Sequence, residues 1–343
     1  MTYELDCSMG EGGGSVVRIA VALAAGKNAS LKLYNIRSNR PNPGLRTQHI
    51  EAINAINKFS GMSSPDLYVG KTQLLLTKAE KENDVAQIKI TTAGSIGLVA
   101  QAVMFYSFSQ KRDLKIVING GATHGKWAPS IEFIQHVTNH IVRRMNKNIE
   151  TKIIRYGFFP KGGAVVHFNF KGYEHLEPLN IVEKGELDKF EIYSTVSKDL
   201  AIRHVAERQI ESFLKKININ VEVIHKPQYV DSFCSGTGLT VIGCYSSGTR
   251  MGSFVPGEKK LSAEKVGELC AILWRKNLNT TASVDIYATD QLIVPMALVE
   301  GKSEITTPEI TNHTRTNIEL VKKILKREIS YKKDKDCFKI TIN

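Results

Sequence analysis

Residues 10–14 read Gly-Glu-Gly-Gly-Gly and open the segment that decides the fold. The apolar stretch 15–25 that follows predicts a helix, and the alternating stretch 31–36 predicts a strand after it. Glycines let the backbone approach a ligand closely, and the N-terminus of the next helix presents unpaired N–H groups and a positive dipole end to an anion. The segment therefore predicts a strand–helix unit with a phosphate site at its turn.

A second anion-binding pattern lies at residues 35–46, Asn-Ile-Arg-Ser-Asn-Arg-Pro-Asn-Pro-Gly-Leu-Arg. Its prolines stiffen the loop, so that Arg37 and Arg40 are held outward, and the planar guanidinium matches phosphate oxygens bidentately. Glu11 in the glycine run would repel a phosphate unless a cation such as Mg²⁺ lay between them. Glu11 is therefore a candidate metal ligand, with helix capping as the alternative role.

The composition points to a globular protein with an anionic partner. The 343 residues are 42% hydrophobic, which allows a large core and suggests two domains. A net charge of +12 favours a polyanion such as nucleic acid, and the alternative is a merely soluble basic surface. The five cysteines form no C-x-x-C pair, so neither a disulfide framework nor a zinc ribbon is indicated. No apolar run reaches transmembrane length, which predicts a cytoplasmic protein without a membrane partner.

A helix, a strand and a second helix recur in the same order along the chain. Residues 31–33 and 114–116 align at a spacing of about 83 residues, which suits a βαβαββ unit. The sequence therefore predicts an α/β fold with three βαβαββ repeats in one large domain. The expected helix, strand and helix are 15–25, 31–36 and 47–59, then 96–110, 114–119 and 130–145, then 291–299, 304–306 and 317–325.

The third repeat is interrupted. Its first helix is expected shortly after residue 180, but the matching helix comes about 110 residues later than the repeat predicts, at 291–299. An insert of about 100 residues is close to the usual size of a domain. We therefore predict that residues 1–180 and 280–343 form the large domain and that 181–279 form an inserted smaller α/β domain. Within the insert we expect a strand at 190–195, a helix at 201–216 and a strand at 220–224.

Three loops occupy equivalent places in the three repeats: the loop with Arg37 and Arg40, the loop with Thr123 and His124, and the loop with His313. If the repeats pack around a pseudo-threefold axis, these loops converge, and convergent loops are where repeated α/β folds bind ligands.

The chain resembles the RNA 3'-terminal phosphate cyclases over essentially its whole length, insert included. The resemblance implies an enzyme that uses ATP with Mg²⁺ or Mn²⁺ to convert the 3'-phosphate of an RNA into a 2',3'-cyclic phosphate. The stretches that carry it are 10–14 with Arg18, 35–45 with Gln48, Gly94-Ser95-Ile96-Gly97-Leu98 with Gln101, Ala288-Thr289-Asp290-Gln291, and His313-x-x-Thr316-Asn317.

The resemblance also implies a three-step reaction. A histidine attacks the α-phosphorus of ATP, which releases pyrophosphate and leaves a histidine-AMP; AMP passes to the RNA 3'-phosphate; and the 2'-hydroxyl then displaces AMP. The first two steps supply a leaving group that a phosphate monoester lacks. Neutral imidazole is nucleophilic near pH 7, and the final ring closure is intramolecular, so orientation accelerates it.

His313 is the expected nucleophile, because it matches the motif and lies just before the predicted helix 317–325, whose N-terminus favours negative charge. Asp290 is expected to orient the imidazole or hold metal, with a helix cap as the alternative. Gln101 lies in an apolar helix, where an amide needs a partner such as nucleotide or backbone. The residues expected to contact the nucleotide are Glu11, Arg18, Gln101, Tyr287, Ala288, Thr289, Asp290 and Gln291. Those expected to contact the RNA phosphate are Arg37, Arg40 and Gln48, and Glu11 is the expected metal ligand. The division of the arginines between ATP and RNA is left open.

Two other functions fit parts of these patterns. A non-catalytic relative of the cyclases that acts in ribosome assembly lacks the nucleophilic histidine, so His313 argues against it. An enolpyruvyl transferase would need two three-unit domains and a longer chain. Gly120-x-x-x-x-Gly125-Lys126 imitates a phosphate-binding P-loop, but Trp127 stands where Ser or Thr is required. The absence of aromatic residues around the signature loops predicts recognition of the terminal phosphate and ribose more than of bases.

Overall fold

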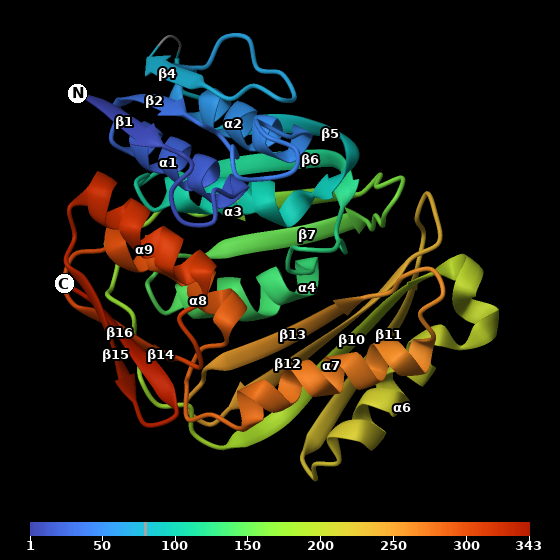
Figure 1. Cartoon of the computed structure of the whole chain (residues 1–343). Helices are drawn as coiled ribbons and strands as arrows, with labels where there is room; N and C mark the ends of the chain where they lie inside the picture. The colour runs from blue at the N-terminus through green and yellow to red at the C-terminus, as the bar shows by residue number, and fades with distance from the viewer. Residues whose placement is uncertain (79–80) are drawn as a thin grey trace.

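Four sheets of four strands each organise the computed structural model, which describes residues 1–78 and 81–343 (Figure 1). In each sheet the first two strands are parallel, and two antiparallel strands extend the pair on one side. In three sheets the extension lies beside the second strand of the pair, and in the fourth it lies beside the first. The fold is mixed α/β, as the sequence predicted.

The three similar sheets belong to successive units of the chain. The first unit contains β1 (Thr2–Asp6), α1 (Gly14–Gly26), β2 (Ser30–Tyr34), α2 (Thr47–Ser60), β3 (Met62–Ser63) and β4 (Leu74–Lys78). The second contains β5 (Val85–Ser95), α3 (Ile96–Ser107), β6 (Leu114–Ala122), α4 (Ile131–Phe133), the π-helical turn η1 (Ile134–Thr138), α5 (Asn139–Arg143), β7 (Ile149–Arg155) and β8 (Val165–Phe170). The third contains β9 (Asn180–Ile181), α8 (Ile286–Leu298), β14 (Ser303–Thr307), α9 (Asn312–Leu325), β15 (Ile329–Asp334) and β16 (Cys337–Ile342).

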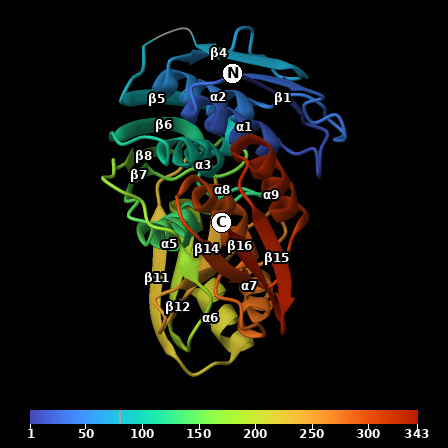
Figure 2. The ribbon, with the colours of Figure 1, turned by 90° about the vertical axis from the view of Figure 1, so that its left-hand side faces the viewer.

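The first helix of each unit is central. In α1 every residue from Val16 to Ala25 is buried, and α3 and α8 are buried nearly as completely. A helix that is apolar all round must be enclosed by other elements, whereas the sheet strands alternate, as in β2, where Leu31 and Leu33 are buried and Lys32 is exposed. The helices therefore lie inside, and the sheets lie toward the outside (Figure 2).

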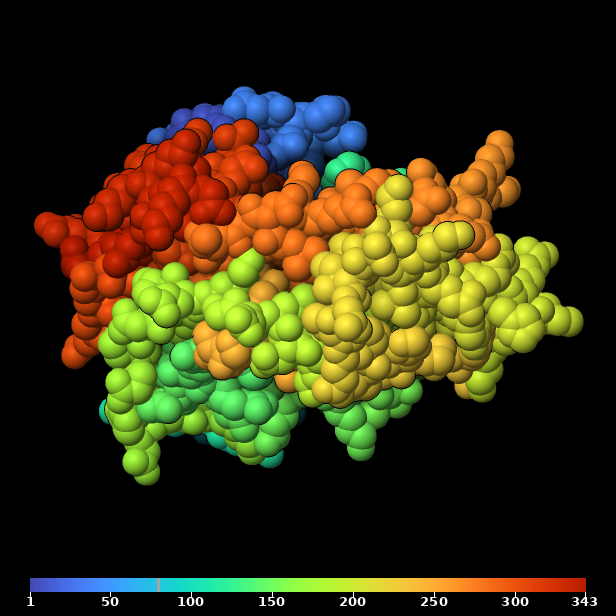
Figure 3. All heavy atoms as spheres, turned by 90° about the horizontal axis from the view of Figure 1, so that it is seen from below, coloured from blue at the N-terminus to red at the C-terminus, as the bar shows by residue number. Residues whose placement is uncertain are grey.

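The fourth sheet separates β9 from α8 in the chain. It has the order β11-β10-β12-β13, and α6 and α7 pack on one of its faces over a separate apolar core that includes Phe190, Phe213 and Trp274. This inserted segment forms the right-hand part of the lower face in Figure 3. The domain limits at 181 and 279 remain predictions. Its elements are β10 (Leu187–Ser197), the 3₁₀ turn η2 (Lys198–Arg203), α6 (Val205–Ile217), β11 (Glu222–Val230), β12 (Thr237–Tyr245), β13 (Arg250–Pro256) and α7 (Ala263–Leu278).

The other face of this fourth sheet packs against α4 and η1 of the second unit. The Thr195 hydroxyl donates to Glu132 Oε1 at 3.0 Å, and the Ser130 and Thr240 hydroxyls lie 2.7 Å apart. The His136 ring stacks on Tyr193 with 4.8 Å between centroids. Buried polar contacts therefore fix how the insert sits on the second unit.

Five helices differ from their predicted limits by three residues or more. Helix α3 ends at Ser107 rather than 110, and α6 begins at Val205 rather than 201, because the 3₁₀ turn η2 precedes it. Helix α8 begins at Ile286 rather than 291, because Asp285 accepts hydrogen bonds from the backbone N–H groups of the first turn. Helix α9 begins at Asn312 rather than 317 for the same reason, with Thr311 as its cap. The helix predicted at 130–145 is interrupted by the π turn η1. Periodicity located these helices, and the capping side chains set their ends.

No helix within the described residues combines the length and the apolar character needed to cross a membrane.

Candidate active site

Glu11 joins two residues that the sequence placed in separate loops. Its Oε2 lies 3.2 Å from Arg40 Nη2 and 3.2 Å from His313 Nε2. The His313 side chain is 53% exposed and that of Glu11 is 24% exposed. The glycine-rich turn, the arginine loop and the start of α9 therefore meet at one half-open, charged site.

The start of α9 is held by side-chain hydrogen bonds. The Thr311 hydroxyl accepts from the Thr314 N–H at 3.0 Å, so Thr311 caps the helix and His313 lies in its first turn. The Thr311 and Thr314 hydroxyls both donate to Asp290 Oδ1 from the neighbouring helix α8. The predicted cap role of Asp290 is therefore wrong, since Asp290 lies inside α8 and Asp285 caps that helix.

Burial raises the pKa of the Asp290 carboxyl to about 6, against the opposing effects of the Thr314 and Thr311 hydroxyls and of the nearby His313 imidazole. Part of the Asp290 population is thus protonated in mildly acidic solution. Because the ionised form would attract a positive charge on His313, the protonation of Asp290 is linked to the electrostatic environment of that ring.

The glycine run packs against α9. Gly10 has a φ of +57°, and a Cβ at this position would overlap the Thr316 side chain. The Glu11 N–H donates to the Thr316 hydroxyl at 3.4 Å. Close packing and a left-handed backbone thus require glycine here and bring Glu11 to His313.

Arg18 is buried without a full set of partners. Its side chain is 7% exposed, its one hydrogen bond runs 3.4 Å to Gln101 Oε1, and its Nε has none within the described residues. Burial lowers the pKa of the guanidinium to about 10. Nearby, α1 begins at Gly14, and Gly13 at its N-cap position offers no side chain to cap the free N–H groups. A buried cation and an uncapped helix N-terminus are together suited to an anion.

His49 belongs to the same basic cluster, and the sequence did not single it out. It is buried, and its Nδ1 accepts from the Arg46 N–H at 3.0 Å. Burial, together with the positive charges of Arg18, Arg37 and Arg46, lowers the pKa of its imidazole to about 3. His49 therefore stays neutral and adds no charge to the cluster; the adjacent Gln48 was the only signal that could have marked it.

The guanidinium groups of the arginine loop make few hydrogen bonds to described residues. Arg37 has a φ of +56° and donates 3.3 Å to the Asn42 carbonyl. Burial, followed by the charges of Arg40 and Arg46, lowers the pKa of Arg37. Gln48 is half-buried, and a Cβ built on Gly94 would lie 3.4 Å from its Cβ. Three like charges held together in this loop leave it able to bind an anion.

The predicted nucleotide-contacting segment 287–291 divides into two faces. Ala288 and Thr289 are fully buried, and the Thr289 hydroxyl bonds to the Asp285 carbonyl and the Thr307 hydroxyl. Gln291 is buried too and accepts from the Thr138 hydroxyl at 3.1 Å. Of this segment only Tyr287 is more than one-third exposed, at 43%.

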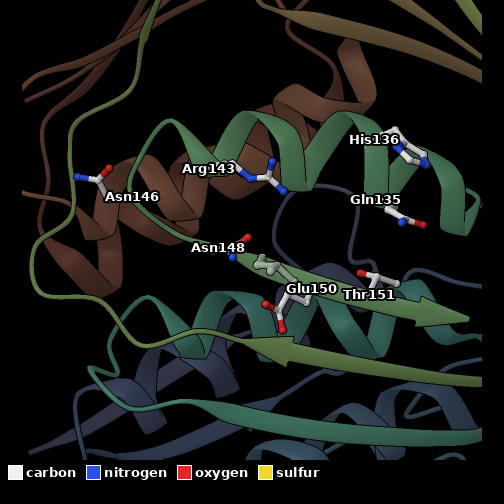
Figure 4. A pocket seen from close by; sticks show the side chains of 8 residues that line it. Gln135, His136, Arg143, Asn146, Asn148, Glu150 and Thr151 are labelled. Carbon is white, nitrogen blue, oxygen red and sulfur yellow. The ribbon is translucent and has the colours of Figure 1, made fainter.

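Gln101 and Gln291 line one small internal cavity of about 10 Å³. Apolar side chains make up most of its lining, and its volume is near the lower limit for a single water molecule. A larger open hollow of about 830 Å³ lies between η1, α5 and β7, where Figure 4 shows Gln135, His136, Arg143, Asn148 and Glu150 around it. It shares no residue with the predicted site.

The loop with Thr123 and His124 does not reach the cluster at Glu11. His124 is instead buried, with its Nε2 2.9 Å from Glu132 Oε2 and its ring against Phe158 and Phe254. Of the three loops expected to converge, those with Arg40 and His313 meet at Glu11, while His124 forms a buried contact with the insert. Within residues 1–78 and 81–343, no three His, Cys, Asp or Glu side chains gather as a metal cluster.

Comparison with known proteins bears on this arrangement. Residues 9–331 match the family model described as RNA 3'-terminal phosphate cyclase. The chain belongs to the RNA 3'-terminal phosphate cyclase family. It is 35% identical to the protein of that name from Desulfurococcus amylolyticus, over 93% of this chain and 91% of the relative. It is 34% identical to the one from Methanococcoides burtonii, over 99% of both, and 33% identical to the one from Thermococcus kodakarensis, over 93% and 92%.

In this member of the cyclase family, two residues that the sequence analysis did not identify, Asp285 and Thr311, support the site. Asp285 accepts 2.9 Å hydrogen bonds from the Tyr287 and Ala288 N–H groups and a 3.0 Å bond from the Gly252 N–H of the insert. Thr311 orders the turn that carries His313. An Asp or Thr just before an apolar helical stretch is a capping signal, and it was present in the sequence at both places.

Proposed function

We propose that this protein is an ATP-dependent RNA 3'-terminal phosphate cyclase in which His313 is the nucleophile. The observation that carries the proposal is the position of His313: its imidazole is half-exposed, lies in the first turn of α9, and is 3.2 Å from the same Glu11 oxygen that meets Arg40. A nucleophile, two flanking carboxylates and a phosphate-binding cation are thereby brought within reach of one ligand.

In the proposed first step a nitrogen lone pair of His313 attacks the α-phosphorus of ATP. The N–P bond forms as the bond to the bridging oxygen breaks, and pyrophosphate leaves with that electron pair. The ring becomes positively charged, and the carboxylates of Glu11 and Asp290 lie where they stabilise this charge. Thr311 and Asp290 hold the first turn of α9 in place, so the imidazole needs little reorganisation.

The nucleotide phosphates would be bound by the basic cluster beside α1. Arg18 has a buried Nε that lacks a partner within the described residues, which is costly unless a ligand supplies an acceptor. The uncapped N-terminus of α1 offers further N–H donors. The sequence left the division of the arginines open, and we now assign Arg18 to ATP, and Arg37, Arg40 and Gln48 to the RNA 3'-phosphate.

The residues fit a metal ion that arrives with the nucleotide rather than one held by the protein alone. Mg²⁺ is commonly bound by one or two carboxylates together with substrate phosphates and water, and Glu11 is a half-buried carboxylate at the site. Mg²⁺ or Mn²⁺ bound there would neutralise charge on the ATP phosphates. In the present arrangement Glu11 contacts both Arg40 and His313, so a metal bound to Glu11 would free Arg40 for phosphate and the His313 imidazole for attack.

The remaining proposed steps transfer AMP from His313 to the RNA 3'-phosphate and then close the ring. An oxygen of the 3'-phosphate attacks the AMP phosphorus as the N–P bond breaks and neutral imidazole is restored. The 2'-hydroxyl then attacks the 3'-phosphorus, loses its proton, and expels AMP. RNA ending in a 2'-deoxyribose should therefore be adenylylated but not cyclised.

The test is to incubate the protein with α-³²P-ATP and Mg²⁺ or Mn²⁺ without RNA, and to measure covalent label on a denaturing gel. The matched control is His175→Ala, because His175 also lies 3.2 Å from a carboxylate, Glu177, at an exposed position. We expect acid-labile, alkali-stable label in the wild type and in His175→Ala, and at least a 10³-fold loss in His313→Ala. Unlabelled wild-type protein would instead favour the non-catalytic assembly function.

A further inference from the structure

Three exposed aromatic side chains come from loops that contact one another. Trp127 is 96% exposed, Phe159 is 74% exposed and Phe233 is 55% exposed. They lie on the β6–α4, β7–β8 and β11–β12 connections, two from the second unit and one from the insert. Solitary exposed apolar residues are ordinary, but a group of aromatic rings on adjoining loops marks an interaction surface.

Backbone contacts hold these loops together. The Thr123 N–H donates 2.9 Å to the Gly157 carbonyl, and His124 pairs with Phe158 in a β-bridge. Trp127 is three residues from one end of that bridge and Phe159 is one residue from the other, so chain length keeps their Cα atoms within roughly 20 Å. The Cys234 thiol lies 3.4 Å from the Phe158 carbonyl oxygen, which ties the third loop to the second.

The charge around the rings is positive. The Arg155 guanidinium lies over the Phe233 ring, 4.3 Å from its centroid, and donates 2.7 Å to the Gly163 carbonyl. Lys161 is exposed, and neither it nor Arg155 forms an ion pair with any described residue. Acidic side chains also contact these loops: Glu258 is paired with Lys126, Asp231 with Lys198, and the buried Glu132 with His124.

Packed residues connect the loops that carry the rings to parts of the predicted site. The Trp127 loop ends at Ser130, which caps α4, and the Phe133 ring of that helix contacts Tyr287 at 6.4 Å between centroids. On the other side, the Phe159 loop packs at Gly162 against the end of β5 near Thr92. Two residues further on, Gly94 adjoins Gln48. The loops that carry Trp127 and Phe159 are therefore connected through packing to the predicted nucleotide segment and to the predicted phosphate-binding residues.

We propose that Trp127 and Phe159, with Arg155 and Lys161 beside them, form a stacking surface for the unpaired bases that precede the 3' end of a single-stranded RNA. Every base has a π-face, so stacking on aromatic rings binds single strands without reading sequence, and the cations meet the phosphates. This inference rests on the proposed function, since it extends the RNA site of that reaction away from the terminal phosphate. It also agrees with the expectation of little base recognition near the terminus itself.

The chain carries its own probe for this surface. It has two tryptophans, of which Trp274 is fully buried in the core of the insert and Trp127 is exposed. Titration with a 3'-phosphorylated, single-stranded uridine decamer should therefore quench tryptophan fluorescence through Trp127. The same titration with a blunt RNA duplex should leave the fluorescence unchanged, because paired bases are not free to stack.

Affinity for the decamer, measured by fluorescence anisotropy, should fall about 10-fold for Trp127→Ala and about 10-fold for Phe159→Ala, while Trp127→Phe retains most of the binding. The matched control is Ile202→Ala, since Ile202 is 86% exposed in η2 of the insert and lies outside the three loops. Adenylylation of His313 without RNA should be unchanged in all four variants.

The two hypotheses fail in distinguishable ways. Wild-type protein that becomes adenylylated but shows neither fluorescence quenching nor loss of decamer affinity in Trp127→Ala and Phe159→Ala would overturn the stacking surface and leave the proposed reaction standing. Protein that is not adenylylated but still shows quenching and the two affinity losses would overturn the reaction and retain the surface. Self-association that disappears in Trp127→Ala, with unchanged decamer affinity, would assign the rings to a contact between copies of the chain and overturn the RNA proposal.

Discussion

Two histidine–glutamate pairs in this protein have nearly the same distance and opposite surroundings. His313 lies 3.2 Å from Glu11 with both side chains accessible to solvent, and His124 lies 2.9 Å from Glu132 with exposed fractions of 0% and 2%. Sequence analysis placed both histidines in equivalent loops. The comparison teaches that position in a repeat is not enough to identify a reactive histidine, because reaction also requires an opening through which a ligand can enter.

The buried pair serves a different purpose from the exposed pair. Burial opposes ionisation, yet the His124 imidazole and the Thr195 hydroxyl hold the pKa of Glu132 below its ordinary value. Thr195 belongs to the insert and Glu132 to the second unit, so this network joins the two. In the exposed pair one carboxylate is shared between His313 and the Arg40 guanidinium, an arrangement that a phosphate or a metal can displace.

The largest expected effect on stability comes from breaking the buried pair. Glu132→Ala leaves the His124 Nε2 and the proton of the Thr195 hydroxyl without their acceptor inside the protein, which should cost about 3–5 kcal/mol of unfolding free energy. Urea denaturation followed by circular dichroism measures the change. The double variant His124→Ala/Glu132→Ala should lose less than the sum of the single variants, since no unpaired charge remains; additive losses would show that the pair is not coupled.

Glu132 also predicts a pH effect with a defined sign. A carboxyl whose pKa is lower in the folded state contributes stability above its unfolded pKa of about 4.3, and this contribution is lost as the pH falls through the lower, folded pKa. Wild-type protein should thus lose stability on acidification more steeply than Glu132→Gln. Parallel curves for the two proteins between pH 2 and 5 would contradict the depressed pKa.

Asp285 is a second buried carboxylate to compare with Glu132, because it accepts its hydrogen bonds from backbone N–H groups and not from a histidine. Asp285→Ala removes the cap of α8 and leaves the Gly252 N–H of the insert unpaired, so we expect a loss of about 2–4 kcal/mol. Asp285→Asn keeps one acceptor and should lose about half as much. Equal urea midpoints for wild type and Asp285→Ala would show that the cap contributes nothing.

Asp290, between the two extremes of exposure, gives the opposite pH dependence from Glu132. Its pKa is raised to about 6, so between about pH 4 and 6 the folded protein holds a proton that the unfolded chain has released, and stability falls as the pH rises through that window. Asp290→Asn should flatten this part of the curve. Thermal unfolding from pH 4 to 7 measures it, and an unchanged slope in the variant would contradict the raised pKa.

The smallest expected effect on stability comes from the exposed pair. Glu11→Gln should change the unfolding free energy by less than about 1 kcal/mol, because half-exposed ion pairs contribute little. The same variant should strongly weaken the metal dependence of histidine labelling, if Glu11 holds the metal as proposed. A loss of stability comparable to that of Glu132→Ala would remove the distinction between the two pairs.

The order of elements could be predicted from sequence because it depends on local patterns. Alternation and helical periodicity located α1, α2, β6 and β14 to within a few residues, and each pattern is complete within a stretch of about 15 residues. The motif at His313 was equally local. The starts of α8 and α9 were wrong because the periodic stretches were read without their caps, Asp285 and Thr311, although both signals lie in the sequence.

The residues of the candidate site could be predicted from the sequence, but the contacts between them could not. Glu11 and Thr316 are 305 residues apart in the chain, and their contact depends on a glycine turn packing against the first turn of α9. The neutral His49, the missing partner of the Arg18 Nε, and the separate role of His124 all follow from burial, which no local pattern encodes.

The amino-acid sequence by itself determined the α/β class, the recurring helix–strand order, the interruption of the third unit, and the residue types gathered for phosphate chemistry. These follow from periodicity, turn residues and motif spacing, which act over short stretches of chain. The tertiary structure alone decided which histidine is open and which is enclosed, which carboxylate joins Arg40 to His313, and that the loops with Trp127, Phe159 and Phe233 contact one another. Those outcomes depend on packing between segments distant in sequence, where solvent exclusion and shape set exposure, charge and contact.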